Sequence, residues 1–189
     1  MWDERYSAAE RIWSTGPNRE VEAIVGGWTP GRALDLGAGE GRHAIWLADR
    51  GWHVTAVDFS AVGIARGREE AADRGLEVEW VVADVTTWRP EPGTAFDLVL
   101  VAYLHVPEDV FSRIGGWLAP GGALVVVGHA LRNLTEGVGG PQDPSILHTT
   151  DQLLAATDGL DVQRCEEVLR PTEAGDAIDV VLVARRPAG

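Results

Sequence analysis

A glycine-rich loop that directly follows a short apolar segment is the feature that most constrains this sequence. Residues 32–36 read Arg-Ala-Leu-Asp-Leu, and residues 37–41 read Gly-Ala-Gly-Glu-Gly. Pro30 and Gly31 precede the apolar segment, so the pattern predicts a buried strand that ends in a tight loop. Because glycines allow bare backbone to approach a ligand, we expect a binding site at the carboxyl end of this strand.

Strand-like and helix-like segments alternate along the chain. Strands are expected at residues 52–57, 77–83, 96–101 and 123–127, and helices at residues 42–49, 61–72 and 107–118. Ser60 can serve as the N-cap of the helix at 61–72. Such alternation, with roughly 20 to 30 residues per unit, is typical of a doubly wound α/β sheet. Two further strands, at residues 160–169 and 177–184, predict an antiparallel hairpin at one edge of the sheet.

Outside the alternating strands and helices, the sequence predicts an N-terminal arm, a long loop and one more short helix. Helices are expected at residues 7–13 and 18–25, with Asn18 as the N-cap of the second, so residues 1–29 form an N-terminal arm ahead of a Rossmann-like core at 30–189. A short helix is expected at residues 150–157 with Thr150 as its cap. Residues 132–144 show no periodicity, and either a substrate lid or a solvated connector explains such a long loop.

Composition limits the kind of protein and its partners. A chain of 189 residues with 45% hydrophobic content fits a single folded domain. The net charge of -13 disfavours binding to nucleic acids and to anionic membranes, because both carry dense negative charge. The single cysteine, Cys165, excludes an internal disulfide, and the N-terminus lacks a signal-peptide pattern. We therefore expect a cytoplasmic protein with no membrane segment.

Three aspartates fall at or near the carboxyl ends of the first three predicted strands, namely Asp35, Asp58 and Asp84. Ligands of open parallel sheets bind in the crevice outside these strand ends, so all three aspartates can face one ligand. The glycine spacing argues against a dinucleotide, because Arg42 occupies the position of the third glycine of that motif. A cofactor without phosphate fits better, with Asp35 accepting a hydrogen bond from an ammonium group. A dinucleotide oxidoreductase remains the alternative within the enzyme class.

The other two aspartates have a ligand interpretation and a structural one. Asp58 can accept hydrogen bonds from both hydroxyls of a ribose, or it can cap the next helix. Asp84 can accept from an adenine amine while the backbone N–H of Val85 donates to a ring nitrogen, or it can serve as a turn residue at the strand end. The order of the three residues along the chain then predicts the order of the ligand's parts.

Four ordered motifs resemble those of class I S-adenosylmethionine-dependent methyltransferases. They are Leu34-Asp35-Leu36-Gly37-Ala38-Gly39-Glu40-Gly41, Val57-Asp58-Phe59-Ser60, Val82-Ala83-Asp84-Val85 and Leu118-Ala119-Pro120-Gly121-Gly122. The resemblance implies S-adenosylmethionine as cofactor and an α/β fold with a mostly parallel seven-stranded sheet. Its strand order would be 3-2-1-4-5-7-6, with strand 7 antiparallel and helices on both faces. Within the family, the short chain and Trp2-Asp3-Glu4-Arg5-Tyr6 are similar to the small tellurite-resistance and thiopurine-type branch.

The resemblance also assigns roles to individual residues. Tyr6 and Trp13 would fold over the cofactor, although both fit equally well as core anchors of the arm. Ala102 and Tyr103 would border the methyl-donor sulfur, and His105 could act as a general base, which methyl transfer does not always need. The complete expected cofactor-binding set is Asp35, Gly37, Ala38, Gly39, Asp58, Phe59, Asp84, Val85, Ala102, Tyr6 and Trp13.

Three histidines, His105, His129 and His148, could converge near the predicted site. Their spacing matches no metal-ligand pattern, so we predict no metal. The leading hypothesis is an enzyme that methylates a small-molecule nucleophile, which could be a thiol, a metalloid oxyanion, a hydroxyl or a carboxyl group. The alternative is a non-catalytic cofactor-binding module that acts through a protein partner.

Overall fold

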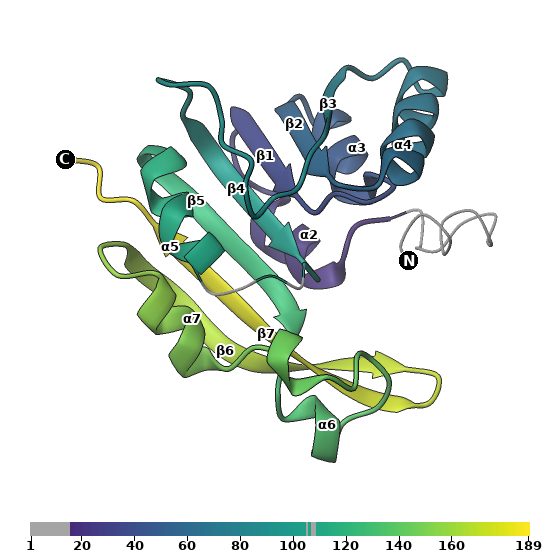
Figure 1. Ribbon diagram of the computed structural model, residues 1–189, viewed down its shortest axis with the longest axis vertical. Helices are drawn as coiled ribbons and strands as arrows, with labels where there is room; N and C mark the ends of the chain where they lie inside the picture. The colour runs from purple at the N-terminus through teal and green to yellow at the C-terminus, as the bar shows by residue number, and fades with distance from the viewer. Residues whose placement is uncertain (1–15, 105, 107–108) are drawn as a thin grey trace. The chain divides into compact units, whose positions relative to one another are not determined.

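A seven-stranded sheet organises the protein, for which we describe a computed structural model (Figure 1). The structure describes residues 16–104, 106 and 109–189, so the predicted helix at 7–13 lies outside the described residues. The strand order is β3-β2-β1-β4-β5-β7-β6. Strands β1, β2 and β3 are parallel, whereas β7 is antiparallel to both β5 and β6. This arrangement confirms the predicted fold class.

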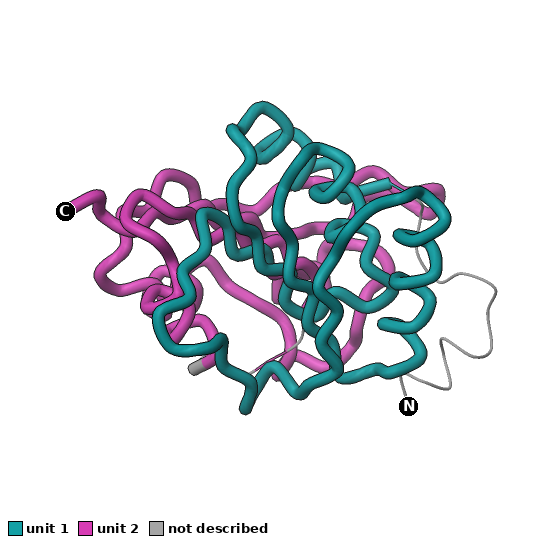
Figure 2. The backbone as a smooth tube through the Cα atoms, turned by 90° about the horizontal axis from the view of Figure 1, so that it is seen from above, with its two compact units in different colours: residues 1–100 teal, residues 101–189 magenta. Residues whose placement is uncertain are grey.

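The chain divides into two compact units, residues 1–100 and residues 101–189, which are described separately below (Figure 2). Strand β4 (Phe96–Ala102) contains the boundary. The predicted organisation as one domain with an arm at residues 1–29 stays a prediction.

The first unit contains three parallel strands and three described helices. Their bounds are α2 (Arg19–Val25), β1 (Arg32–Leu36), α3 (Arg42–Ala48), β2 (His53–Asp58), α4 (Ala61–Asp73) and β3 (Val78–Val82). Asn18 caps α2 by accepting from the amides of Glu20 and Val21, and Ser60 caps α4 by accepting from Gly63. Both N-caps had been predicted from the sequence, and each satisfies a helix amide that would otherwise lack a partner.

The core of the first unit lies along β1 and the helices that follow it. Leu34, Leu36, Leu47 and Ile64 are among its fully buried side chains. Removing each from water contributes about 2 kcal/mol to folding. The register of the strands places Asp35 opposite Ala56, and Ala56 opposite Trp80. The ends of β1, β2 and β3 are thereby aligned at one edge.

The second unit has three strands and several short helices. Their bounds are α5 (Asp109–Ile114), the 3-10 helix η1 (Gly115–Trp117), β5 (Leu118–His129), α6 (Asn133–Glu136), the 3-10 helix η2 (Pro144–Ile146), α7 (Thr150–Ala156), β6 (Asp161–Thr172) and β7 (Gly175–Arg185). The predicted terminal hairpin is confirmed, with β6 and β7 paired from Asp161↔Arg185 to Thr172↔Gly175.

Three expectations for this unit were wrong in detail. Strand β5 starts at Leu118, because Gly121 and Gly122 already exchange backbone hydrogen bonds with Arg186. The loop at residues 132–144 contains α6, which ends where Gly137 follows. The cap of α7 is Thr149, which forms a capping box with Gln152.

Within the described part of the chain, no helix is both long enough and apolar enough to cross a bilayer.

Candidate functional site

The glycine loop after β1 has a backbone that only glycine adopts readily. The φ angles of Gly37, Gly39 and Gly41 are +74°, +57° and +76°, all in the left-handed region. The amides of Gly37 and Ala38 donate to the carbonyl of Val57, at 2.8 and 3.1 Å. The loop therefore turns across the end of β2, and the tight turn after β1 agrees with the sequence pattern, while ligand binding by the loop stays a prediction.

Trp80 on β3 explains why the third glycine of the loop is needed. A Cβ atom at Gly41 would lie 2.3 Å from Cη2 of Trp80, and one at Gly67 on α4 would lie 2.6 Å from the same atom. Both distances are far too short for real carbon atoms. Gly41 thus makes room for the half-buried indole of Trp80, a role that the sequence did not indicate.

Asp58 joins the glycine loop to the start of α4. Its Oδ2 accepts from the amide of Gly39 and its Oδ1 from the amide of Ser60, both at 2.8 Å. The side chain is 7% exposed. The N-cap of α4 is Ser60 and not Asp58. Asp58 supports the cap only by accepting the amide of Ser60. A carboxylate oxygen that accepts one hydrogen bond still has a second lone pair for a ligand hydroxyl.

Asp35 is a fully buried carboxyl group of the first unit. Its side chain is 1% exposed, and its Oδ2 has no hydrogen-bond partner among the described residues. Burial raises the pKa of Asp35 to about 7, although a backbone hydrogen bond with Ala44 and the charge of Arg42 act in the opposite direction. A buried carboxylate oxygen without a donor fits a ligand that brings an ammonium N–H.

The residues after β2 and β3 present apolar surface and a turn. Phe59 and Val82 are both 52% exposed, which is unusual for side chains of their size. Oδ1 of Asp84 accepts from the amide of Thr86 at 2.8 Å and from its hydroxyl at 2.7 Å, and these bonds lower the pKa of Asp84. Asp84 is therefore a turn residue, as its structural interpretation stated, and Val85 beside it is buried.

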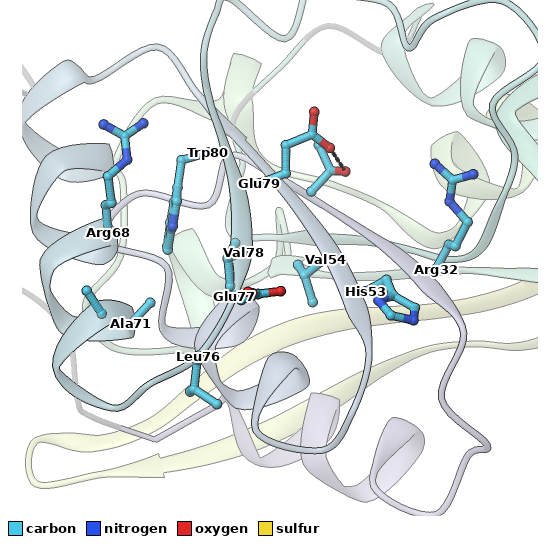
Figure 3. Close-up of a pocket in the computed structure, with 12 residues that line it drawn as sticks. Arg32, His53, Val54, Arg68, Ala71, Leu76, Glu77, Val78, Glu79 and Trp80 are labelled. Carbon is cyan, nitrogen blue, oxygen red and sulfur yellow. Dashed lines mark hydrogen bonds between the residues drawn. The ribbon is translucent and has the colours of Figure 1, made fainter.

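A pocket of about 520 Å³ lies elsewhere in the first unit (Figure 3). It is lined by Arg32, His53, Val54, Thr55, Arg68, Ala71, Ala72, Leu76, Glu77, Val78, Glu79 and Trp80. No residue of the glycine loop and none of the three strand-end aspartates lines it. This pocket is thus separate from the predicted ligand-binding residues. Trp80, which lines the pocket, also lies against Gly41 of the glycine loop.

In the second unit, Tyr103 directly follows β4 in an unusual conformation. Its φ is +54°, and it is the one described residue other than glycine with a positive φ. Its amide donates to the carbonyl of Val127 at 2.7 Å, and its hydroxyl donates to Oδ2 of Asp179 at 2.5 Å. Left-handed backbone at a bulky residue costs free energy and concentrates at functional sites.

Asp179 on β7 is the centre of a polar cluster, which we call the Asp179 cluster (Tyr103, His129, Arg170 and Asp179). Nε of Arg170 donates to Oδ2 of Asp179 at 2.7 Å, and Nδ1 of His129 lies 3.4 Å from its Oδ1. Burial alone would raise the pKa of Asp179, but the hydrogen bonds from the three partners outweigh it and hold the pKa below its ordinary value. Asp179 is 1% exposed and remains charged.

Sequence reasoning missed Asp179 and Arg170, although one signal was available. Asp179 is a lone charged residue inside the apolar run from Ala177 to Ala184, on a strand that is otherwise buried. A charge in such a position needs partners, because an unpaired buried charge is very costly. The partners come from residues 9 and 76 positions away in the chain, so spacing alone could not identify them.

The remaining predicted residues are placed as follows. His105, Tyr6 and Trp13 lie outside the described residues. His148 pairs with the end of β5, its amide donating to the carbonyl of His129 at 3.0 Å, and its ring packs edge-on against Phe111. Across the described ranges, no three His, Cys, Asp or Glu side chains form a group that could hold a metal ion.

Part of the chain is similar in sequence to known methyltransferases. Residues 33–122 match the family described as methyltransferase domain. The demethylmenaquinone methyltransferase of Thermus thermophilus is 35% identical in an alignment of 133 positions. The alignment covers 65% of this chain and 60% of that protein. The chain spans about half the length (54%) of the curated relatives that it matches first.

Solved structures agree on the fold. TehB from Haemophilus influenzae superimposes with a TM-score of 0.75 at 17% identity, covering 98% of this chain and 67% of that one. The N-methyltransferase NodS from Bradyrhizobium japonicum, in complex with S-adenosyl-L-homocysteine, gives 0.73 at 18% identity, covering 98% and 96%. The chain therefore has the same fold as these two structures.

Proposed function

We propose that this protein transfers the methyl group of S-adenosylmethionine to a small-molecule nucleophile. The observation that carries the proposal is the buried, unpartnered Oδ2 of Asp35 beside a glycine loop that Asp58 holds in place. The loop, the orphaned oxygen and the strand-end carboxylate provide what a zwitterionic nucleoside without phosphate requires. A pyrophosphate would instead meet two carboxylates here, which disfavours a dinucleotide.

The donor's parts follow the order of the strands. Asp35 accepts from the ammonium group, and the backbone of Gly37, Ala38 and Gly39 lies against the amino-acid tail. Asp58, which holds the loop through the amide of Gly39, accepts from the ribose hydroxyls.

The adenine part uses the residues after β2 and β3. The exposed rings and methyl groups of Phe59 and Val82 supply apolar surface for a purine. The Oδ2 of Asp84 accepts from the exocyclic amine, while Oδ1 stays in its turn with Thr86. The amide of Val85 donates to a ring nitrogen.

The bound cofactor supplies an electrophilic methyl group on a sulfonium. The protein's own contribution is to bind, orient and shield from water, because holding two reactants in line replaces a costly encounter in solution. Ala102 and Tyr103 are assigned to the border of the methyl-donor sulfur. His105, Tyr6 and Trp13 keep the roles that the family resemblance implies.

The acceptor is proposed to be a small molecule handled in the cytoplasm. Support comes from relatives named for small-molecule substrates, such as the demethylmenaquinone methyltransferase. The net charge of -13 supports the same class, since it opposes the phosphate contacts on which nucleic-acid binding depends.

Calorimetry and a turnover screen test the proposal. S-adenosylhomocysteine is expected to bind one per chain, and NAD is expected not to bind. Release of S-adenosylhomocysteine from S-adenosylmethionine is then measured over thiols, metalloid oxyanions, phenols, amines and carboxylic acids. Tight binding of NAD without binding of S-adenosylhomocysteine contradicts the donor assignment. Intact donor binding with zero turnover on every acceptor favours the non-catalytic module.

A further inference from the structure

Asp35 lies where the structure supports a negative charge poorly. The side chain is almost completely buried in β1, and among the described residues its Oδ2 accepts no hydrogen bond. A backbone hydrogen bond with Ala44 on α3 supports the carboxyl group from one side. A charged carboxylate that leaves water needs donors for both of its oxygens, and here one oxygen lacks them. The surroundings of Asp35 therefore favour the neutral carboxyl group.

Arg42 and Asp58 act on the charge of Asp35 in opposite directions. The positive charge of Arg42 on α3 favours ionisation, whereas the carboxylate of Asp58 at the end of β2 opposes it. His43, the next residue on α3, adds no charge near neutral pH. Its ring is buried, its Nε2 accepts from the amide of Asn18 at 3.2 Å, and burial lowers its pKa to about 3. Burial thus dominates, and the pKa of Asp35 is about 7.

An ammonium group on a ligand would reverse this balance at Asp35. It brings an N–H donor for the Oδ2 that lacks one, and it brings a positive charge to a buried carboxyl group. Both effects stabilise the charged form and lower the pKa of a carboxyl group. A nucleoside without an ammonium group brings neither. The two kinds of ligand therefore differ in the protonation state of Asp35 that they favour.

We propose that Asp35 holds a proton in the ligand-free protein and releases it to solvent when the ammonium group of the donor binds. The inference rests on the proposed function. The O–H bond of the carboxyl group breaks, its electron pair stays on the carboxylate, and the ammonium group keeps its own protons. Asp35 is then a specificity-determining residue. Affinity for an ammonium-bearing nucleoside rises with pH, whereas affinity for a nucleoside without this group does not.

The size of the effect follows from the linkage between proton binding and ligand binding. The complex holds fewer protons than the ligand-free protein, so a higher pH favours the complex. With half of the Asp35 groups protonated at about pH 7, binding should release about 0.9 proton per chain at pH 6 and about 0.1 at pH 8. The affinity should therefore fall about tenfold from pH 8 to pH 6.

Calorimetric titration of S-adenosylhomocysteine at pH 6, 7 and 8, in buffers of different ionisation enthalpy, measures the released proton. Asp35→Asn is expected to bind more weakly than the wild type and to lack the proton release that the wild type shows at pH 6. Titration of the ligand's own ammonium group occurs with both proteins and cancels in the comparison. Asp73→Asn, which changes an exposed aspartate at the end of α4, is the matched control and should behave like the wild type.

Methylthioadenosine provides the matched ligand, because it carries the nucleoside and the sulfur without the amino-acid tail. Its affinity for the wild type should not rise between pH 6 and pH 8. Binding of S-adenosylhomocysteine to the wild type with no proton release at pH 6, or with the same release as in Asp35→Asn, overturns the inference. If S-adenosylhomocysteine does not bind at any pH, the proposed function itself fails.

A second measurement needs no binding by the variant. Carbon NMR of ¹³C-labelled protein reports the charge of each carboxyl carbon, and the signal of Asp35 is assigned by its absence in Asp35→Asn. At pH 6 this signal should show a neutral carboxyl group in the ligand-free wild type and a charged one after S-adenosylhomocysteine is added. A charged Asp35 in the ligand-free protein at pH 6 overturns the inference.

Discussion

The first unit and the second unit hold their polar groups in different ways. In the first, backbone amides of Gly39 and Ser60 converge on one carboxylate, Asp58. In the second, the side chains of Tyr103, Arg170 and His129 converge on another, Asp179. Both carboxylates are buried, at 7% and 1% exposure. One is held by loop geometry and the other by a network of side chains.

This difference predicts where each unit is vulnerable. A site made from backbone is damaged by an added Cβ atom, because glycine torsions and close approaches are its working parts. A site made from side chains is damaged by the loss of one polar partner, because the others then remain buried without it. The predictions below follow this contrast in order of decreasing effect.

The largest effect is expected from the charge of Asp35. Its pKa is about 7 in the folded protein, against an ordinary value of 3.8, so the folded state binds the extra proton between these pH values. The free energy of unfolding therefore falls as pH rises from about 4 to about 7, on the order of 4 kcal/mol in total. Asp35→Asn lacks this fall.

Guanidinium unfolding of both proteins at pH 4.5, 6 and 8 checks the prediction. The difference in stability between Asp35→Asn and wild type should grow in favour of the variant as pH rises. Parallel pH dependences would show that Asp35 is ionised in the folded protein and that its Oδ2 has a donor.

Gly41→Ala tests the backbone character of the first unit. The substitution adds a Cβ atom at a φ of +76° and places it 2.3 Å from Trp80. Left-handed strain and overpacking together should cost about 3 kcal/mol. Gly75→Ala is the matched control, since its φ is +67° and a Cβ there meets nothing within 4 Å. The control should lose only about 1 kcal/mol from strain. An equal loss of unfolding free energy in Gly41→Ala and Gly75→Ala would show that contact with Trp80 does not add to the cost at Gly41.

Tyr103→Phe tests the side-chain network of the second unit. It removes the hydroxyl that donates to Asp179 at 2.5 Å and leaves the ring in place. A hydrogen bond to a buried charge is worth about 2 kcal/mol, and the free energy of unfolding should fall by that amount. Thermal and denaturant unfolding at neutral pH measure it. An unchanged stability would mean that Arg170 and His129 alone satisfy the carboxylate.

The smallest effect is expected at the ion pair between the glycine loop and α4. Nη1 of Arg66 lies 2.9 Å from Oε1 of Glu40, and the side chains of Glu40 and Arg66 are 10% and 31% exposed. Glu40→Gln should cost about 1 kcal/mol, and the loss should shrink in high salt. Glu70→Gln, which weakens the looser pair with Arg74 at 3.6 Å, is the comparison and should cost about 0.3 kcal/mol. A larger loss of stability in Glu70→Gln than in Glu40→Gln would contradict the stronger ion pair at the glycine loop.

The parts of the molecule that could be predicted from sequence are those built from neighbouring residues. Asn18 and Ser60 were expected as N-caps because a cap depends on the next three residues. The strand order came from the resemblance of four motifs, and the structure confirms it. The three carboxylates were found because each lies within two residues of the end of its own strand.

The parts that could not be predicted depend on contacts between distant residues. Nothing near Gly41 in the chain shows that Trp80, 39 positions later, needs its space. Tyr103 and Asp179 are 76 positions apart, and their bond depends on the pairing of strands that the sequence does not specify residue by residue. Asp84 and Thr86 form a local turn, yet the same pattern serves a ligand equally well, so sequence left both interpretations open.

Calorimetric titration of S-adenosylhomocysteine into three proteins tests most directly that the strand-end carboxylates of the first unit bind the donor. The wild type should bind one molecule per chain, and Asp58→Ala should lose at least about 100-fold in affinity, since the loop and the ribose both lose their acceptor. His53→Gln, which changes an exposed histidine at the start of β2, should bind like the wild type. Equal affinity of Asp58→Ala and wild type, or an equal loss in His53→Gln, would contradict this account.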